Sequence, residues 1–361
     1  MENNNKKTST DNNKHILKRF IVSLAVLLLT VTAVVIFFDP FYHFHAPIGF
    51  KAVLNQPEYQ CIGTIKNFNY DSVIVGSSMA ENYNNKDFDN RFGCKTVKAI
   101  KTSGTVPDLM YYLNVAFETH KISNVFYSLD VTSLMNETTA SFLDDEKIPH
   151  YLYDENPFND VKYIFNKDVI FEDIPYMLAM NFSGDFEEGK SYNWAKYKSF
   201  SLNDAINHYE RPEKQPQMFS EEVYKPVIGE NIELIKNMIE EHPDTSFYIF
   251  IPTYSVLWWD ACERQGIYEE SLYAIEQILN TFTAYDNVNF YNFLSDREIS
   301  FNLDNYTDQV HFKEEINSLI VERLYTGEYL VDEFHSTESY EAILETASKA
   351  LNEERLKYFD E

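Results

Sequence analysis

The chain reads Ser72-Val73-Ile74-Val75-Gly76-Ser77-Ser78, and this stretch decides the fold class. A short run of β-branched residues is typical of a buried strand, and the glycine and serines after it are typical of a tight turn into a helix. Similar apolar runs recur at residues 96–100, 124–131, 246–252 and 288–293. We therefore expect a sheet whose strands are separated by other elements.

Helical patterns lie between several of these runs. Apolar residues recur at three- and four-residue intervals in residues 107–120, 230–241 and 268–282, which is typical of helices with one buried face. Pro107 suits the first turn of a helix, because an N–H there has no partner within the helix. Strands that alternate with helices predict an α/β domain with a mostly parallel sheet covered on both faces.

Small and polar residues stand at the ends of three of the expected strands. Gly76-Ser77-Ser78 ends the first strand, Ser103-Gly104 follows the second, and Asp130 lies at the end of the third. Ligand sites of parallel sheets form beyond the carboxyl ends of the strands. The sequence thus brings these residues into one candidate site.

A second motif, Asp308-Gln309-Val310-His311, follows more than two hundred residues later. An aspartate three residues before a histidine can reach that imidazole when both lie in a loop or a first helical turn. With Ser78 exposed on a strand–helix turn, the set contains the parts of a hydrolytic triad, with Ser78 as nucleophile, His311 as base and Asp308 as the carboxylate that orients the base. Each motif alone has an ordinary explanation, since small residues after a strand commonly cap the next helix and Asp-x-x-His occurs by chance.

The N-terminal region predicts a membrane anchor. Residues 20–38 contain no charge and are just long enough to cross a bilayer. Basic residues precede the run and Asp39 follows it, so residues 1–19 should be cytoplasmic and the rest of the chain extracytoplasmic. A cleaved signal peptide is the alternative. The length of the run and the bulky residues at 36–38 disfavour cleavage.

The composition limits the partners. The formal net charge of −27 argues against nucleic acid or anionic lipid as the partner of the globular part. The three cysteines have no CxxC spacing, so we expect free thiols, with a Cys61–Cys94 bridge as the alternative. Of the nine histidines only His43 and His45 are closely spaced. We therefore expect no metal and no cofactor.

The chain is long enough for one large α/β domain, or for a domain with a sizeable insertion. We expect a juxtamembrane segment at residues 39–69 and the α/β domain at residues 70–325. Its strand–helix alternation fades at residues 132–225, which we interpret as an insertion that covers the active-site edge; an excursion without ligand contact is the alternative. Residues 326–361 are an acidic tail with helical runs, which either packs on the domain or projects as a partner-binding helix.

With these motifs, residues 70–324 apart from the insertion resemble the SGNH, or GDSL-like, hydrolase superfamily. The members most similar in character are cell-surface proteins that accompany membrane-bound O-acyltransferases, such as the D-alanine transfer protein of teichoic acid synthesis and the alginate O-acetylation proteins. The resemblance implies the SGNH hydrolase fold, a flavodoxin-like three-layer sandwich with a central, mostly parallel sheet.

The resemblance also implies roles for single residues. Gly76-Ser77-Ser78 matches the family's Gly-Asp-Ser block, which makes Ser78 the nucleophile and places its N–H in the oxyanion hole. Gly104 matches the glycine of the second block, whose N–H binds the same oxyanion. Asp308 and His311 match the last block.

One position departs from the family pattern. The third block supplies an asparagine to the oxyanion hole, but here Asp130 occupies the matching position. An ionised carboxylate would oppose the oxyanion, where loss of one donor already costs about 3 kcal/mol. The alternatives are that Asp130 is protonated, points away, or binds a substrate hydroxyl.

Two aromatic residues after the fourth strand are further candidates for substrate binding. Tyr254 could donate a hydrogen bond and Trp258 could stack on a sugar ring. Ordinary core packing is the alternative for each.

We therefore expect a membrane-anchored extracytoplasmic serine O-acyltransferase or esterase that acts on a cell-surface polysaccharide or acylated glycan through an acyl-serine. The resemblance adds a membrane-bound O-acyltransferase as a partner. The alternative is a catalytically weak scaffold or polysaccharide-binding partner of such an acyltransferase, which Asp130 favours. A lipase has less support, because no long apolar lid is evident.

Overall fold

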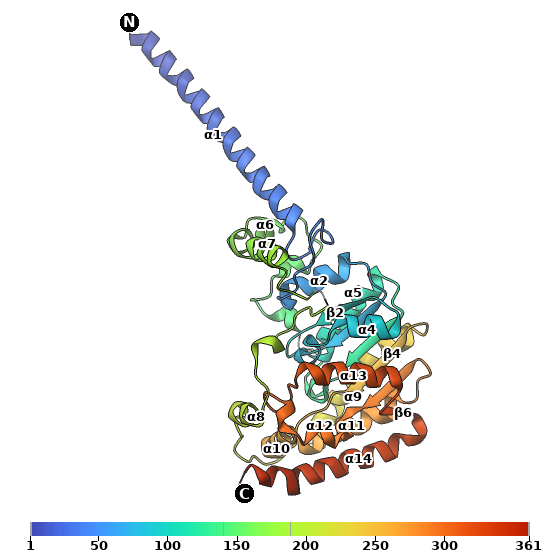
Figure 1. Ribbon diagram of the computed structural model, residues 1–361. Helices are drawn as coiled ribbons and strands as arrows, with labels where there is room; N and C mark the ends of the chain where they lie inside the picture. The colour runs from blue at the N-terminus through green and yellow to red at the C-terminus, as the bar shows by residue number, and fades with distance from the viewer. Residues whose placement is uncertain (1, 140, 188, 360–361) are drawn as a thin grey trace.

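The computed structural model describes residues 2–139, 141–187 and 189–359, and a long N-terminal helix leads there into an α/β domain (Figure 1). Within these residues the sheet has six strands in the order β2-β1-β3-β4-β5-β6. All neighbouring strands are parallel except β5 and β6, which are antiparallel. The prediction of an α/β fold with a mostly parallel sheet is confirmed. The strands are β1 (Ser72–Gly76), β2 (Thr96–Ile100), β3 (Asn124–Ser128), β4 (Ser246–Ile251), β5 (Val288–Asn292) and β6 (Leu330–Val331).

Helices cover both faces of the sheet. One face carries a row of four neighbouring helices, and the other carries two. The row consists of α2 (Pro57–Asn67), α5 (Val106–Thr119), α9 (Glu221–Glu241) and α11 (Tyr268–Phe282), and the opposite pair of α4 (Asn85–Phe92) and α13 (Glu314–Thr326).

Strand periodicity explains how one sheet contacts both layers, because successive side chains of a strand point to opposite faces. Phe126 of β3 and Tyr248 of β4 stack on each other and both contact Phe92 of α4. The preceding residue of β4, Phe247, contacts Phe117 of α5 on the other side. The interiors of β1, β3 and β4 are therefore apolar on both faces, as expected of a buried parallel sheet.

Most predicted elements lie close to where the sequence places them. β1, β2 and α11 have the predicted bounds, but β3 ends at Ser128 instead of residue 131 because the chain turns at Asp130 into η1 (Val131–Met135). α9 begins at Glu221 instead of residue 230, so its first turns belong to the stretch that we interpret as an insertion. α2, α4, β6 and α10 (Val256–Gln265) were not predicted.

α1 (Glu2–Phe38) contains a segment, Asn13–Phe38, that is long and apolar enough to span a membrane. The side chains of this segment are almost all exposed, so α1 is not a core helix of the domain. It projects away from the domain as a single rod (Figure 1). These properties are those expected of a membrane anchor.

The carboxylate of Asp39 fixes the chain where α1 ends. It accepts hydrogen bonds from the N–H groups of His43, Phe44 and His45 at 3.0, 2.7 and 3.0 Å, and from the hydroxyl of Tyr163 at 2.8 Å. Burial raises the pKa of Asp39, and these hydrogen bonds oppose the rise. After this turn α2 packs against β2 and α5. The juxtamembrane segment is thus part of the folded domain.

The predicted insertion consists of short helices joined by turns. Two of them, α6 and α7, lie beside the end of α1 (Figure 1). The elements after η1 in this region are η2 (Phe142–Asp144), η3 (His150–Leu152), α6 (Val161–Ile164), η4 (Val169–Asp173), α7 (Ile174–Ser183), η5 (Ala195–Tyr197) and α8 (Leu202–His208). The remaining short elements of the domain are α3 (Ser78–Glu81), η6 (Phe293–Ser295), α12 (Arg297–Ser300) and η7 (Leu303–Asn305).

The acidic tail packs on the domain. It contains η8 (Glu333–His335), α14 (Ser336–Lys349), η9 (Ala350–Glu354) and η10 (Arg355–Lys357), and it buries Ile343, Ala347 and Ala350. α14 packs against α11, and η9 packs against α10. The tail is therefore held along its length and does not project as a free helix.

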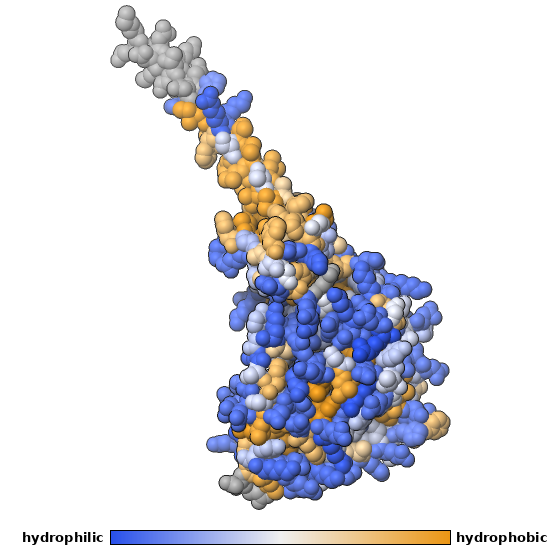
Figure 2. All heavy atoms as spheres, in the orientation of Figure 1, coloured by the Kyte–Doolittle hydropathy of each residue, from blue (hydrophilic) through white to orange (hydrophobic). Residues whose placement is uncertain are grey.

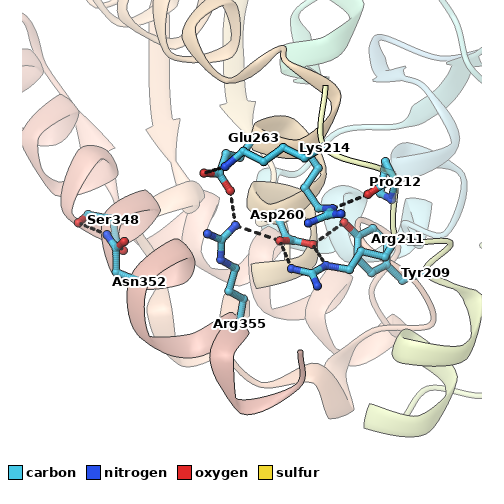
Figure 3. Close-up of polar contacts among 10 residues, drawn as sticks. Tyr209, Arg211, Pro212, Lys214, Asp260, Glu263, Ser348, Asn352 and Arg355 are labelled. Carbon is cyan, nitrogen blue, oxygen red and sulfur yellow. Dashed lines mark hydrogen bonds and ion pairs between the residues drawn. The ribbon is translucent and has the colours of Figure 1, made fainter. Parts of the chain in front are cut away.

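Ion pairs around Asp260 of α10 fix the end of this tail (Figure 3). The buried carboxylate accepts hydrogen bonds from Arg211 at 2.9 Å, Arg355 at 3.0 Å and the hydroxyl of Tyr209 at 2.9 Å. Arg355 also pairs with Glu263. Burial alone would raise the pKa of Asp260, but the hydrogen bonds from Arg211 and Tyr209 lower it below its ordinary value. The cluster joins α10, the tail and the end of the predicted insertion.

Candidate active site

The site begins at the turn from β1 into α3. A Cβ on Gly76 would lie 2.7 Å from the Cβ of Ala80, so only glycine allows the helix to start this close to the strand. Ser77 is the N-cap of α3, and its hydroxyl accepts a hydrogen bond from the Met79 N–H at 3.3 Å. Ser78 is the first residue of the helix. Ser77 therefore has the capping role that small residues often have after a strand. The hydroxyl of Ser78 does not cap the helix.

Folding brings Ser78 and His311 into contact. The Ser78 Oγ lies 2.8 Å from the His311 Nε2, and the His311 Nδ1 lies 2.7 Å from the Asp308 Oδ2. The other carboxylate oxygen of Asp308 accepts hydrogen bonds from the N–H groups of Val310 and His311 at 2.9 and 2.8 Å. The motif thus folds into a tight loop that points the imidazole at the serine, as the spacing predicts.

The environment of Asp308 keeps it ionised. Burial alone would raise its pKa, but the hydrogen bond from the His311 ring, the charge of that ring and the two backbone N–H groups lower the pKa below its ordinary value of 3.8. An ionised carboxylate holds the proton on the His311 Nδ1 and leaves the Nε2 free to accept one. The geometry therefore aligns a hydroxyl, an imidazole and a carboxylate, the three groups that the sequence predicts for a hydrolytic triad.

Asp130 lies in the same site and does not point away. Its carboxylate accepts hydrogen bonds from the hydroxyl of Ser77 and from that of Tyr254, the latter at 2.9 Å. Burial raises the pKa of Asp130, and these two hydrogen bonds and the nearby His311 oppose the rise. Of the alternatives that the sequence left open, orientation away from the site is wrong, whereas protonation and a bond to substrate stay open.

Gly104, which the resemblance predicts to bind the oxyanion, lines the same cavity as Ser78. Its neighbour Ser103 has a positive φ of 54°, which turns the chain sharply after β2. The Gly104 N–H donates to the Lys101 carbonyl at 2.8 Å, so it must leave or share that bond to hold an oxyanion. A Cβ on Gly104 would lie 2.8 Å from the same oxygen. Its role in oxyanion binding stays a prediction.

A cavity of about 560 Å³ opens at Ser78 and His311. Its walls include Asp130, Tyr254 and Trp258, so all the residues predicted to bind substrate lie together. Tyr254 and Trp258 are only 2% and 4% exposed and pack on each other with ring centroids 4.5 Å apart. Little of the Trp258 ring face is therefore free for stacking on a sugar. The size of the cavity suits a small ligand or one unit of a larger one.

Sequence reasoning missed a tryptophan that contacts the ring of His311. Trp194, from the predicted insertion, meets the His311 ring edge-to-face with centroids 5.0 Å apart. It also lines a second cavity of about 390 Å³, whose walls include Glu81 of α3 and Tyr176 of α7. The insertion therefore reaches His311. A tryptophan in a polar, loop-like stretch was the signal available in the sequence.

Two buried polar side chains hold this part of the insertion against the end of α3 and against β2. The Asn82 side-chain oxygen accepts hydrogen bonds from the N–H groups of Trp194 and Ala195 at 3.1 and 3.0 Å. The Lys98 Nζ donates to the carbonyls of Glu81 and Ser191, both at 2.6 Å. Burial lowers the pKa of Lys98 to about 7. These contacts tie β2, the end of α3 and the insertion together behind the site.

Among the described residues no group of three or more His, Cys, Asp and Glu side chains could hold a metal ion. The His43 Nε2 lies 3.0 Å from the Asp160 carboxylate, and the ring nitrogens of His45 lie near the carbonyls of Ala46 and Ile36. Cys61, Cys94 and Cys262 are free thiols, so the alternative Cys61–Cys94 bridge is not formed.

No protein-family model matches the chain, and no curated protein sequence matches it significantly. The case for a function therefore depends on the geometry of the site.

Proposed function

We propose that the chain is a membrane-anchored serine esterase or O-acyltransferase that acts on an acylated cell-surface polysaccharide. One observation carries the proposal, the alignment of the Ser78 hydroxyl, the His311 imidazole and the Asp308 carboxylate at separations of 2.8 and 2.7 Å. Serine hydrolases and acyltransferases use this arrangement to activate a hydroxyl that is otherwise a weak nucleophile. The site lies at the mouth of a cavity, where a substrate can enter.

In this mechanism the Ser78 Oγ attacks the acyl carbonyl carbon and gives its proton to the His311 Nε2. The tetrahedral intermediate collapses when His311 returns that proton to the leaving oxygen, and an ester remains on Ser78. A sugar hydroxyl or water then attacks this ester, with His311 again accepting and returning the proton. Asp308 holds the imidazole in the required tautomer and offsets its charge in each half-reaction.

Location at a membrane supports transfer as the physiological reaction. α1 would hold the domain at the membrane surface, where a membrane-bound O-acyltransferase could supply the acyl group and nascent polysaccharide could receive it. One cavity is lined by His311 and a second by Trp194, whose rings are in contact, and the two cavities provide room for a donor and an acceptor. We further propose that the domain belongs to the SGNH superfamily and lies on the extracytoplasmic side.

A fluorophosphonate probe tests the proposal, because it reacts with a serine only when a base activates the hydroxyl. We expect the full-length protein in detergent micelles to be labelled at neutral pH. Ser78→Ala should abolish labelling, and His311→Ala should lower its rate by a factor of about 10³ or more.

The chain offers a matched control for the histidine variant. His335 and Asp332 form a second Asp-x-x-His pair with the ring nitrogen 2.6 Å from the carboxylate, but this pair is exposed at η8 and does not line the cavity at Ser78. His335→Ala should leave the labelling rate unchanged. Loss of labelling in this variant would show that the assay reports protein stability instead of catalysis.

A catalytically weak scaffold remains the second candidate, favoured by the carboxylate of Asp130 in the site and by the engaged N–H of Gly104. A folded wild-type protein that does not react with the probe would favour this scaffold and contradict the enzyme.

A further inference from the structure

Large apolar side chains are exposed along one stretch of the predicted insertion. Phe158, Phe171 and Phe182 are 86%, 74% and 82% exposed, and Val161 and Phe165 lie among them at 53% and 43%. We call these five residues the apolar face. Isolated exposed apolar residues are common on soluble proteins, but five within 25 residues of the chain indicate a surface that is covered in use.

The opposite side of the same segment is packed. The buried residues of α6, η4 and α7 are Tyr163, Val169, Ile174 and Met177. The segment is therefore amphipathic and well supported, and its exposed phenylalanines are not a sign of missing structure. An amphipathic helical segment of this kind is typical of elements that lie in the plane of a membrane interface.

The apolar face is attached to the end of the spanning helix. α6 packs against α1, the Tyr163 hydroxyl bonds to Asp39 at 2.8 Å, and the His43 ring lies 3.0 Å from Asp160. α7 is tied to the same region, because the Asn181 side chain exchanges hydrogen bonds of 2.9 and 3.1 Å with the backbone of Lys51. Figure 1 shows α6 and α7 beside the domain end of α1, and Figure 2 shows apolar surface continuing from α1 onto this region.

The length of α1 places this region at the edge of the bilayer. Residues 20–38 form a helix of about 28 Å, close to the hydrocarbon thickness of about 30 Å. The boundary of the hydrocarbon core then falls near Phe38, where α1 ends and the segment held by Asp39 begins. A face that contacts this segment lies at the height of the lipid headgroups.

We propose that the apolar face inserts into the headgroup boundary of the bilayer that α1 crosses, so that the domain is attached at two places. Residues 158–182 contain two basic residues, Lys162 and Lys167, and four acidic ones, Asp160, Asp168, Glu172 and Asp173. Apolar contact therefore drives the insertion, and zwitterionic lipid is sufficient. Two attachments fix the height and the tilt of the domain relative to the bilayer. Residues of α7 also line the cavity that Trp194 lines, so this cavity lies next to the second attachment.

Depth-dependent quenching tests the proposal on the full-length protein in phosphatidylcholine vesicles without other proteins. Single cysteines replace Phe171 and Phe182 in a Cys94→Ser background, since Cys61 and Cys262 are buried, and each carries an environment-sensitive fluorophore. Both labels should lose more fluorescence to lipids with a spin label near the headgroup than to lipids labelled near the chain end.

Two reference positions calibrate this experiment. A label at Leu29, 70% exposed in α1, should be quenched most by the deep spin label, whereas one at Phe334, 89% exposed on η8, should be quenched by neither. Labels at Phe171 and Phe182 that behave like the Phe334 label would overturn the proposal and leave the apolar face for a protein partner. An unquenched Leu29 label would overturn it as well, because α1 would then not cross the bilayer. None of these results depends on the reactivity of Ser78.

Discussion

Ser77 and Ser78 are neighbours in the chain, but their hydroxyl groups have different partners. Ser77 caps α3 and donates to Asp130, whereas Ser78 faces His311. The strand–helix turn produces this division, because the first residue inside the helix and the cap before it point in different directions. The pair therefore provides an internal comparison of a structural serine with a proposed nucleophile.

Asp130 is the residue whose replacement is most informative at this scale. Asp130 lines the same cavity as Ser78, and an ionised carboxylate there opposes the negative charge that develops in the reaction, so Asp130→Asn should raise the rate of fluorophosphonate labelling by roughly 10-fold. The amide keeps the size of the side chain and can still bond to Ser77 and Tyr254. Labelling time courses of the two proteins measure the effect.

Asp130→Asn should also change the stability of the folded protein. Burial raises the pKa of Asp130 in the folded protein. The free energy of unfolding therefore falls as the pH rises from 3.8 to the raised pKa, and this loss is complete at higher pH. Asp130→Asn should therefore have a higher Tm than the wild type at neutral pH, and the difference should shrink in acid. A slower-labelling variant with unchanged Tm would mean that the carboxylate assists the reaction.

The sequence predicts those residues of the site that belong to short motifs, and it does not predict the others. Ser78, Asp308 and His311 could be found because each sits in a short motif whose spacing is fixed by one turn. Trp194 could not, because it belongs to no motif of its own and lies in the predicted insertion, where the strand–helix pattern that orders the rest of the site fades. The engaged N–H of Gly104 depends on the conformation of one turn, which the sequence does not specify.

At the scale of elements, periodicity predicted the buried strands and failed where a helix has little apolar pattern. α4 buries only Phe88, so its sequence has no stripe to recognise. α10 has the opposite character, since its first seven residues are all buried. β6 has two residues and depends on its pairing with β5. Tertiary packing decides all three elements, and local sequence carries little of that information.

The contact between the insertion and α3 yields a prediction at this scale. Asn82→Ala removes the acceptor of two N–H groups, at Trp194 and Ala195, which should lower the free energy of unfolding by about 2 kcal/mol. Trp194 would then no longer hold the His311 ring, so fluorophosphonate labelling should slow roughly 10-fold. Denaturant titration and labelling rates measure the two effects.

Asn67 provides the matched control for this variant. Its amide donates to the carbonyls of Tyr42 and His43 at 2.8 and 3.2 Å, which ties α2 to the juxtamembrane turn away from Ser78. Asn67→Ala should destabilise the protein without slowing the labelling of the folded fraction. Equal slowing in both variants would show that the insertion has no specific role in positioning His311.

At the scale of the whole molecule, the Asp260 cluster joins distant parts of the chain into one unit (Figure 3). Asp260→Asn leaves Arg211 and Arg355 facing each other without their shared carboxylate. The free energy of unfolding at neutral pH should fall by about 3 kcal/mol, as for other buried ion pairs that lose one partner. Glu345→Gln, which removes an exposed partner of Arg297, is the control and should change little.

The pH dependence of this difference follows from the direction of the pKa shift. Since the pKa of Asp260 is lowered in the folded protein, its stabilisation is present above 3.8 and is lost as the pH falls through the lowered pKa. The gap between wild type and Asp260→Asn should therefore close in acid. A gap that stays constant down to the lowest accessible pH would mean that packing, and not charge, carries the effect.

The most direct test of the central claim is to locate the adduct after the full-length protein has reacted with a fluorophosphonate, by tandem mass spectrometry of the peptide that contains both serines. The account predicts the phosphonate on Ser78, with Ser77 unmodified. An adduct on Ser77 or on a residue outside this turn, or a folded protein without any adduct, would contradict it.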